Sequence, residues 1–414
     1  WMHGDIKGAF LSDTDTTNAV GTELHPNGNS NFSSTDVSYI TNTASGTATV
    51  TSNQLVLSGG TAGYSDHIFT VSNLEVGAQY MITIDYVAKS AGASSIGFYV
   101  NGAYLNELND SSGYIARSTG KSYTFYFTTA FSSRTIDLVT GGNTSHTHTF
   151  DNWSIKKVEE DRSVNNKGLQ VFGTITKSAV ATGAELVGYS GFSDSNYLSL
   201  PYDSIFDFGT GNFSITVWVK PGTTSTQQSI LNFLSTNSGG TVEDGFYLVH
   251  YNNASGNWYF GTYENGSVLY TSLSLGSITS TDKWYCLHVN KIGTTAYLYQ
   301  DGEAIGHSPV KSDISINPAD VNRTDLRVGR GRGNGLPFNG SVSLLRISGT
   351  TPSPEQIKKI YEDEKHLFQE NAKATLYGSS DAVTALAYDD TTNLLHVGTS
   401  AGRSEFQGLR RINN

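Results

Sequence analysis

Apolar and polar residues alternate along most of this chain with a period of two, the pattern of β-strands that bury one face and expose the other. The alternation is clearest in 212–221, where Phe, Ile, Val and Val occupy one set of positions and Ser, Thr and Trp the other. Gly, Asn and Ser separate such segments, as tight turns require. This pattern predicts an all-β protein.

A first series of alternating segments lies within residues 24–158. The segments are 50–57, 80–87, 95–100, 122–127 and 134–139. Their spacing is typical of a sandwich or jelly roll. Residues 159–166 are polar and lack periodicity, so we expect a linker there.

A second series spans 167–361. After 212–221, strands are expected at 284–289, 295–302, 326–329 and 338–347. A helix closes the series, because Ser353 and Gln356 have the spacing of a capping box and Pro354 suits the first helical position. Apolar residues continue at helical spacing, so we expect this helix over 353–371.

The order and spacing of these strands from Tyr197 to Tyr361 resemble the laminin G-like, concanavalin A-like β-sandwich. The first series is similar, more loosely, to the carbohydrate-binding jelly rolls of many glycan-degrading enzymes. That similarity rests on Asn27-Gly28, on Val76-Gly77 and on the segment that begins at Phe150. Both resemblances imply surface-binding modules, usually for carbohydrate, and neither by itself implies an enzyme.

The two ends of the chain resemble pieces of a β-propeller-like repeat. Residues 383–402 look like one strand–turn–strand unit, and residues 1–11 look like the close of such a unit. One partial repeat cannot stand as a propeller. We therefore expect partial β-structure at 1–23 and 372–414, completed by further repeats or by partner chains. The predicted fold is two tandem β-sandwich (jelly-roll) domains with one C-terminal helix and these flanking pieces.

Charge and cysteine content narrow the range of partners. The chain has 26 Lys and Arg against 37 Asp and Glu, a net charge of −11, without a basic run, so nucleic acid is not an expected partner. No apolar run approaches the roughly 18 residues of a membrane span, so membrane insertion is not expected either. Cys286 stands alone, which excludes an intrachain disulfide and favours a bacterial or viral source.

Catalytic motifs are not found. Glucanases of the concanavalin A-like fold carry Glu-x-Asp-x-x-Glu on one strand, which places two carboxyls on the same face. This chain has no such run: Glu362 and Glu364 fall on the expected helix, and Glu243 and Asp244 fall in a Gly-rich turn. We therefore expect a protein that is not an enzyme.

Exposed aromatic rings are the candidates for sugar binding, because flat rings stack on pyranose faces. In the second domain the candidates are Tyr247, Tyr251, Trp258 and Tyr263, with Tyr259 in the same group; in the first they are Tyr64, Tyr99 and Tyr104. The alternative is that strand periodicity places about half of them in the core. Trp153 and Trp218 are assigned to packing.

Ion sites are expected in both domains. The resembled families often bind structural calcium, which suggests Asp151 with Asn27 in the first domain and Asp203 or Asp244 in the second. The alternative is that these are ordinary turn residues. Arg330 and Arg332 lie in a Gly-rich hairpin loop and are candidate contacts for acidic sugar or phosphate groups. His146 and His148 have the spacing of a metal pair, but ordinary polar strand residues are the favoured interpretation.

Tandem glycan-binding-like sandwiches, a single cysteine and Ser-, Thr- and Gly-rich strands together predict a phage virion protein. Residues 371–409 also resemble phage tail-fibre proteins. We expect an extracellular tail-fibre or appendage protein that attaches to host-surface glycans and contacts other virion proteins, as a homo-oligomer with a trimer favoured. Two alternatives stay open: a purely structural virion or decoration protein, and a fragment of a bacterial secreted glycan-active enzyme.

Overall fold

The computed structural model describes every residue except 1–4, 27–30, 61–63, 94–95, 101–102, 105–118, 142–145, 225, 251–256, 271–277, 333–334, 373–375, 377–381, 409 and 414. Its regular structure is almost entirely antiparallel β, with one short α-helix near the C-terminus, which confirms the predicted fold class. Within the described residues, no helix has the length and apolar composition needed to cross a membrane.

The chain folds into two compact units. The N-terminal unit comprises Val20–Glu159 and Gly168–Val171, and the C-terminal unit comprises Trp1–Ala19, Glu160–Lys167 and Phe172–Asn414. The segment 160–167, expected as a linker, is held in the C-terminal unit by one buried carboxylate. Asp161 accepts hydrogen bonds from the backbone N–H groups of Ala9 (2.8 Å), Ser163 (2.9 Å) and Lys167 (3.0 Å).

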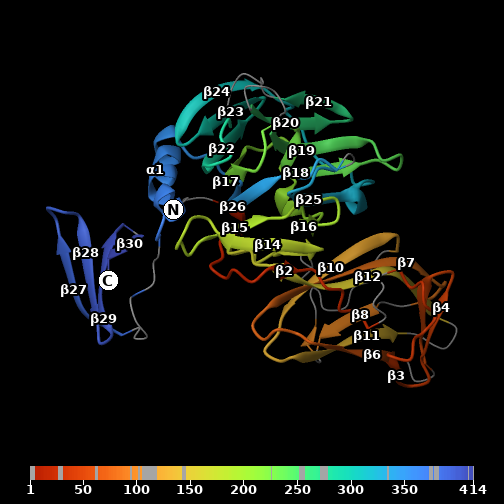
Figure 1. The fold of residues 1–414 in the computed structure, drawn as a ribbon. Helices are drawn as coiled ribbons and strands as arrows, with labels where there is room; N and C mark the ends of the chain where they lie inside the picture. The colour runs from red at the N-terminus through yellow and green to blue at the C-terminus, as the bar shows by residue number, and fades with distance from the viewer. Residues whose placement is uncertain are drawn as a thin grey trace. The chain divides into compact units, whose positions relative to one another are not determined.

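The N-terminal unit consists of two antiparallel sheets (Figure 1). Its strands are β3 (Thr41–Asn42), β4 (Thr47–Thr51), β5 (Gln54–Ser58), β6 (Tyr64–Ser72), β7 (Gln79–Lys89), β8 (Ile96–Val100), β9 (Ala103–Tyr104), β10 (Lys121–Thr128), β11 (Ser133–Gly141), β12 (Thr147–Glu159) and β13 (Leu169–Phe172). One sheet has the order β3-β6-β11-β8-β9. In the other, β10, β7 and β12 are neighbours, β5 and β13 also pair with β12, and β4 pairs with β5.

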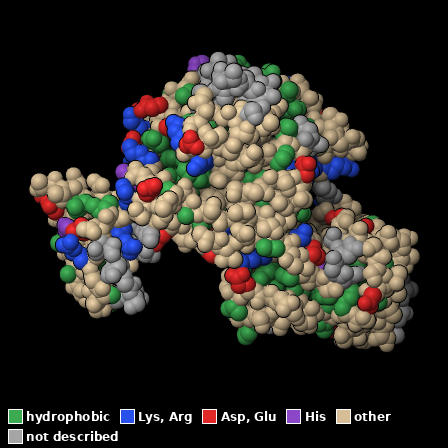
Figure 2. Space-filling model, viewed as in Figure 1, with side chains coloured by type: hydrophobic (Ala, Val, Ile, Leu, Met, Phe, Trp, Pro, Cys, Tyr) green, Lys and Arg blue, Asp and Glu red, His purple; other side chains and the backbone are tan. Residues whose placement is uncertain are grey.

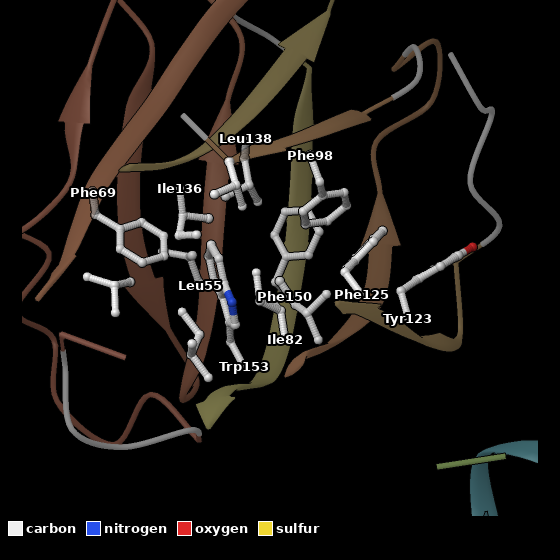
Figure 3. Packing of buried hydrophobic residues seen from close by; sticks show 14 of the residues in the cluster. Leu55, Phe69, Ile82, Phe98, Tyr123, Phe125, Ile136, Leu138, Phe150 and Trp153 are labelled. Carbon is white, nitrogen blue, oxygen red and sulfur yellow. The ribbon is translucent and has the colours of Figure 1, made fainter. Parts of the chain in front are cut away.

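Aromatic rings fill the space between these two sheets (Figure 3). Trp153 and Phe150 from β12 point inward together with Phe69 from β6 and Phe98 from β8. The Trp153 and Phe69 rings pack edge to face with centroids 4.9 Å apart. Trp153 is fully buried, so its assignment to packing is confirmed.

A β-bulge on β12 makes this core possible. Asn152 adopts a left-handed backbone with φ of +48°, and the register with β7 shifts between Asp151 and Ser154. Without the bulge, a period of two would point Phe150 and Trp153 to opposite faces. With it, both rings face the core.

The C-terminal unit has a two-sheet sandwich with a helix on its surface. Its elements are β1 (Ile6–Phe10), β14 (Thr174–Ala179), β15 (Val187–Ser190), β16 (Tyr197–Pro201), η1 (Ser204–Phe206), β17 (Phe213–Pro221), β18 (Gln228–Thr236), β19 (Val242–His250), β20 (Trp258–Glu264), β21 (Ser267–Tyr270), β22 (Tyr285–Ile292), β23 (Thr295–Gln300), β24 (Glu303–Pro309), η2 (Val321–Arg323), β25 (Thr324–Val328), β26 (Gly340–Ser348), α1 (Pro354–Glu364) and η3 (Lys365–Phe368). β2 (Ala19–Val20) lies at the boundary between the units.

The two sheets of the sandwich can be followed in Figure 1. Sheet one has the order β14-β15-β26-β17-β22-β23-β24, and sheet two has the order β16-β25-β18-β19-β20-β21. Phenylalanines from both sheets meet in the core: Phe213 of sheet one lies 5.0 Å from Phe246 and 6.1 Å from Phe260 of sheet two, centroid to centroid. β1 pairs with β26 and buries Phe10 against Phe206, so residues 6–10 are an added strand of this sandwich.

The helix α1 begins as predicted and is fixed by one carboxylate. The Ser353–Gln356 capping box is present, and Ile357 and Ile360 are buried. Glu364 forms a bidentate ion pair with Arg346 of β26 and accepts a hydrogen bond from Trp218 Nε1 at 2.8 Å. Trp218 is thereby buried against the helix, which confirms its assignment to packing. Figure 2 shows charged side chains of both signs gathered over α1, where Lys358 pairs with Glu303.

The C-terminal residues form a separate sheet. β27 (Val383–Asp389), β28 (Leu394–Thr399), β29 (Gly402–Gln407) and β30 (Arg410–Asn413) pair in sequence order (Figure 1). The strand–turn–strand expected within 383–402 is therefore present. A four-stranded meander is also the form of one propeller blade.

Acid should destabilise the N-terminal unit through His25. The His25 ring is buried among Phe32, Tyr39, Phe69 and Trp153, and burial lowers its pKa to about 3 from an ordinary 6.5. As pH falls through 6.5, His25 becomes protonated in the unfolded chain but stays neutral in the folded chain. Stability is therefore full above 6.5 and is lost progressively as pH falls toward 3.

Thermal unfolding of the wild type and of His25→Phe at about pH 7 and about pH 4 checks this expectation. The variant should lose less stability than the wild type over that interval. The comparison between the two proteins cancels the other titrating groups that they share. Equal losses in both would contradict the assignment to His25.

Candidate functional site

A row of paired residues crosses the outer face of sheet two, the face turned away from the phenylalanine core. In register, the row runs Ser199, Arg327, Asn232, Tyr247, Gly261 and Tyr270, one residue from each of the six strands. Residues paired across an antiparallel sheet point to the same side. One end of the row is therefore polar and charged, and the other is aromatic.

Four tyrosines gather at the aromatic end. The ring of Tyr247 lies 5.9 Å from Tyr259 and 5.7 Å from Tyr263, and Tyr259 lies 5.4 Å from Tyr270, all between centroids. Gly261 leaves the space for this arrangement, because a Cβ at that position would lie 2.3 Å from Tyr247 Cζ. The tyrosine cluster (Tyr247, Tyr259, Tyr263 and Tyr270) thus depends on a missing side chain at the centre of β20.

The tyrosine cluster lines a cavity of about 440 Å³ on the outer face of sheet two. Polar groups reach the same cavity from neighbouring strands and from the hairpin that follows β25. The described residues that line it are Gln227, Ser229, Asn232, Leu234, Val242, Tyr247, Val249, Tyr259, Tyr263, Val268, Tyr270, Gly331, Arg332 and Leu336. None of these described residues is a carboxylate. We call this space the tyrosine cavity.

Burial favours the neutral form of two hydroxyl groups in the cavity, those of Tyr247 and Tyr263. Burial raises the pKa of Tyr247 far above its ordinary value, and the neighbouring Tyr259 and Tyr263 add to the rise. Burial likewise raises the pKa of Tyr263. Gln227 donates a hydrogen bond to the Tyr259 hydroxyl at 3.0 Å. Neutral phenols both donate and accept hydrogen bonds, so the walls combine apolar ring faces with groups that suit hydroxylated ligands.

Arg332 contributes a guanidinium that is already engaged in an ion pair. It forms an ion pair with Asp325 and donates to the Thr236 hydroxyl at 3.3 Å. Asp325 also accepts hydrogen bonds from Arg327 (2.6 Å) and from Ser199 (2.9 Å). Burial lowers the pKa of Arg332, and the attraction of Asp325 opposes this.

Two buried polar atoms near the cavity have no partner among the described residues. They are Oδ1 of Asn232 and Nε of Arg332. Each such atom costs about 1–3 kcal/mol when left unsatisfied. A buried polar group without a hydrogen-bond partner calls for an explanation, such as a functional role or a bound water or ion.

The structure separates the predicted sugar-binding residues of the C-terminal unit. Tyr247 and Tyr263 meet in the tyrosine cavity. Trp258 does not: its side chain is 0% exposed, and its Nε1 donates to Gln300 at 2.9 Å. Trp258 precedes Tyr259 on β20, so its side chain lies on the opposite face of the sheet and points into the core. This corrects the expectation that Trp258 is an exposed sugar-binding residue. Tyr251 lies outside the described residues.

The predicted residues of the N-terminal unit share one sheet. Tyr99 of β8 is half-buried and lies in register with Asp137 of β11 and with Tyr104 of β9. Burial, and to a smaller extent the nearby Asp66, raises the pKa of Asp137 to about 6. Tyr64 is on β6 in the same sheet, but the side chains of Tyr64 and Tyr104 are outside the described part.

The predicted anion contacts are both engaged in ion pairs. Arg330 lies 3.6 Å from Asp194 and stacks over the Tyr197 ring, with its guanidinium 5.1 Å from the ring centroid. Arg332 is held by Asp325 as described above. Of the two, only Arg332 borders the tyrosine cavity. Contact of either residue with an anion stays a prediction.

The candidate metal ligands do not come together. Asp203 is buried in an ion pair with Lys167 and caps η1 by accepting from Ile205 N at 3.0 Å. Asp244 accepts from Asn265 N at 2.8 Å and so fixes the turn between β20 and β21. Asp203 and Asp244 thus each have a structural role, and calcium binding by either residue stays a prediction. Within the described chain, no three His, Cys, Asp or Glu side chains form a metal-binding group.

The remaining candidates belong to the N-terminal unit. Asp151 accepts from the backbone N–H of Asn152 at 2.8 Å and lies opposite Asp85 in the register of β12 and β7. Asn27 lies outside the described residues. His148 is buried and bonds to the Tyr86 hydroxyl at 2.7 Å, as expected for a polar residue of a strand.

Sequence reasoning left Tyr270, Gln227 and Gly261 out of the site. Tyr270 ends a short strand that has little alternation of its own, and Gln227 precedes β18. The available signal was on β20, where Tyr259, Gly261 and Tyr263 alternate with Trp258, Phe260 and Thr262. A glycine between two tyrosines on one face marks a place where another side chain approaches the backbone closely.

Part of the chain matches a known family. Residues 192–358 match the laminin G model described as the concanavalin A-like lectin/glucanases superfamily. This match, together with the two stacked sheets, supports the predicted resemblance of the C-terminal unit to the concanavalin A-like sandwich. None of the curated proteins matches the chain.

Several solved structures are similar at low identity. Domain 4 of AbnA, an extracellular arabinanase from Geobacillus stearothermophilus in complex with arabinotriose, is 16% identical and has a TM-score of 0.38, covering 49% of this chain and 92% of its own. The CBM40 of a Ruminococcus gnavus IT-sialidase is 13% identical with a TM-score of 0.33, covering 44% and 100%. The binding domain of Paraclostridial Mosquitocidal Protein 1 is 12% identical with a TM-score of 0.39, covering 58% and 61%.

Filling the space at Gly261 should disturb the tyrosine cluster. Gly261→Ala places a methyl group against the Tyr247 ring and should cost about 1–3 kcal/mol of unfolding free energy. Chemical denaturation should show a smaller cost when Tyr247→Ala is already present, because the obstructing ring is then gone. Strictly additive effects of the two substitutions would contradict the packing described here.

The structural role of Asp203 predicts an effect that calcium does not alter. Asp203→Asn leaves Lys167 as a buried unpaired charge and should cost about 3–5 kcal/mol, with or without calcium. Asp244→Asn is the matched control, since it weakens one hydrogen bond at a cost of about 1 kcal/mol. Calcium-dependent unfolding of the wild type that Asp203→Asn abolishes would instead identify Asp203 as a ligand.

Proposed function

We propose that this chain is a non-catalytic, glycan-binding protein that holds a sugar in the tyrosine cavity of its C-terminal unit. The observation that carries the proposal is the arrangement of four tyrosines around Gly261 on the outer face of a lectin-type sandwich. Nothing in the core requires this cluster, because the phenylalanines of the same strands already fill the space between the sheets.

The chemistry of the cavity suits a sugar. Aromatic rings present flat apolar faces to the C–H groups of a pyranose, while hydroxyl, amide and guanidinium groups bind its hydroxyls. The tyrosine cavity offers both kinds of group, in Tyr247 and Tyr263 on one hand and in Gln227, Asn232 and Arg332 on the other. Its volume of about 440 Å³ is within the usual range for small-molecule sites.

The absence of a carboxylate among the described lining residues supports a binding role. Glycoside hydrolysis generally uses two carboxyl groups about 5–10 Å apart on either side of the scissile bond. Three carboxylates close to cavity residues are engaged elsewhere: Asp325 by Arg327 and Arg332, Asp244 in the β20–β21 turn, and Glu243 by the side chain of Asn237. A ligand in this cavity would therefore be bound and released unchanged.

The finer proposal is a tail-fibre or appendage protein of a phage virion that attaches to host-surface glycans. Support comes from the uncharged Ser-, Thr- and Gly-rich strands and from the propeller-like C-terminal repeat. A single sugar site binds weakly, so display on a homo-oligomer, with a trimer favoured, would supply avidity. Structural calcium stays part of the proposal, at Asp151 with Asn27 in the N-terminal unit and at Asp203 or Asp244 in the C-terminal unit.

A specific observation also favours a structural role among virion subunits. Leu386 and Tyr388 of β27 are 65% and 62% exposed and share a sheet face with Val397 and Phe406. A sheet with one apolar face is normally covered by another layer. Contacts with other virion proteins through β27 would be compatible with glycan binding in the tyrosine cavity.

Loss of a cavity tyrosine should abolish glycan binding. The full chain, multimerised and applied to a glycan array with and without calcium, should bind a defined set of glycans. Tyr247→Ala and Tyr263→Ala should each weaken that binding by about tenfold or more, since each removes a stacking surface. Tyr297→Ala is the matched control, because this exposed tyrosine lies on β23 of the other sheet.

Three results would overturn the proposal. Binding that survives both tyrosine substitutions would place the sugar elsewhere. A folded, multimerised chain that binds no glycan would favour the structural role. Release of a shortened product from a bound oligosaccharide would restore the enzyme alternative.

A further inference from the structure

A second cavity, of about 490 Å³, lies on the outer face of sheet one, beside α1. Aromatic and basic side chains line it together. They are Trp218 and Lys220 from β17, Lys283 and Trp284 from the segment before β22, and Tyr361, Lys365 and Phe368 from α1 and η3. Two carboxylates, Asp282 and Glu370, also line the cavity. We call this space the lysine cavity; none of its described lining residues lines the tyrosine cavity.

The aromatic rings of the lysine cavity are held in place by contacts within the protein. Trp284 donates from Nε1 to the backbone oxygen of Val180 at 2.9 Å. Phe368 packs between the two tryptophans, with centroid distances of 4.1 Å to Trp218 and 4.9 Å to Trp284. Trp284 is only half-buried, so part of its ring remains available on the surface. A ligand ring would therefore meet a preformed apolar surface.

Three ammonium groups surround this wall in a chain whose net charge is −11. Lys365 pairs with Glu362 and follows the last turn of α1, where a cation offsets the partial negative charge of the helix end. Lys283 is 3.9 Å from Asp301, a weak and exposed pair. Lys220 forms no ion pair or side-chain hydrogen bond within the described part of the chain. The described lining thus holds three ammonium groups against two carboxylates, and Lys220 is the ammonium group that stands without an ion pair among the described residues.

We propose that the lysine cavity binds a sugar ring that carries an anionic substituent, a carboxylate or a sulfate. The sugar ring lies against Trp284 and Phe368, and the anionic group faces Lys220 and Lys283. A neutral sugar would gain only the stacking, whereas a small inorganic anion would gain only the charge. The combination of both features in one cavity selects the acidic sugar. This site is independent of the tyrosine cavity and does not require that cavity to bind a glycan.

Titration of the full chain with glucuronate, glucose 6-sulfate and glucose, followed by NMR or calorimetry, tests the proposal. Both anionic sugars should bind more tightly than glucose, with a preference that shrinks as salt is added. The double variant Lys220→Gln/Lys283→Gln should lose about tenfold or more in affinity for the anionic sugars. Lys121→Gln, an exposed lysine of the N-terminal unit, should change nothing.

A second pair of variants separates this site from the tyrosine cavity. Trp284→Phe should weaken glucuronate binding while the protein keeps its thermal stability, and Tyr247→Ala should leave glucuronate binding intact. Loss of glucuronate binding in Tyr247→Ala, with none in the lysine variants, would overturn the proposal by moving the anionic sugar to the tyrosine cavity. Equal affinities for glucuronate and glucose, or no binding of either anionic sugar, would also overturn it.

Discussion

Alternation of side chains along β20, whose pairing with β19 and β21 has no register shift, is the constraint on which the tyrosine cavity depends. On β20 the inward positions are Trp258, Phe260 and Thr262, and the outward positions are Tyr259, Gly261 and Tyr263. One strand therefore supplies both the core and the tyrosine cavity. Because the period is two, a shift of one residue would send the tyrosines into the core and the tryptophan into water. The rigid core thus holds the site in register.

The carboxylates of this protein are used mainly to hold the chain together. Asp161 fixes the segment 160–167, Asp203 neutralises Lys167, and Glu364 ties α1 to β26 and β17. Such groups look like candidate ligands or catalysts in a sequence, since the same residue types serve both purposes. Their partners are far away along the chain, so only the folded structure reveals that they are already engaged. Asp203 and Asp244 are examples, because the sequence does not show the groups that already engage their carboxylates.

The sequence predicted those features of the structure that depend on residues close together along the chain. The strand periodicity, the Ser353–Gln356 capping box and the buried roles of Trp153 and Trp218 were all predicted correctly, because each depends on neighbouring residues. Three features depended on distant or irregular structure instead: the bulge at Asn152, the pairing of β1 with β26, and the approach of Tyr270 to Tyr259. Tyr247 and Tyr263 could be chosen from the sequence as candidate residues of an exposed site. The sequence did not show which face of β20 carries Trp258, so its burial in the core could be seen only in the structure.

The two cavities differ in the kind of ligand that their walls favour. In the tyrosine cavity the described lining has one cation, Arg332, which is held by Asp325, a carboxylate that also pairs with Arg327. A charged ligand would have to compete with that carboxylate, so hydroxyl groups are the better match. In the lysine cavity the ammonium groups are partly unpaired, and an anion replaces water at their surface. A sandwich has two outer faces, and this chain provides each with aromatic rings but with a different balance of charge. A surface that carries both neutral and acidic sugars could therefore be contacted through two chemically distinct sites on a single sandwich.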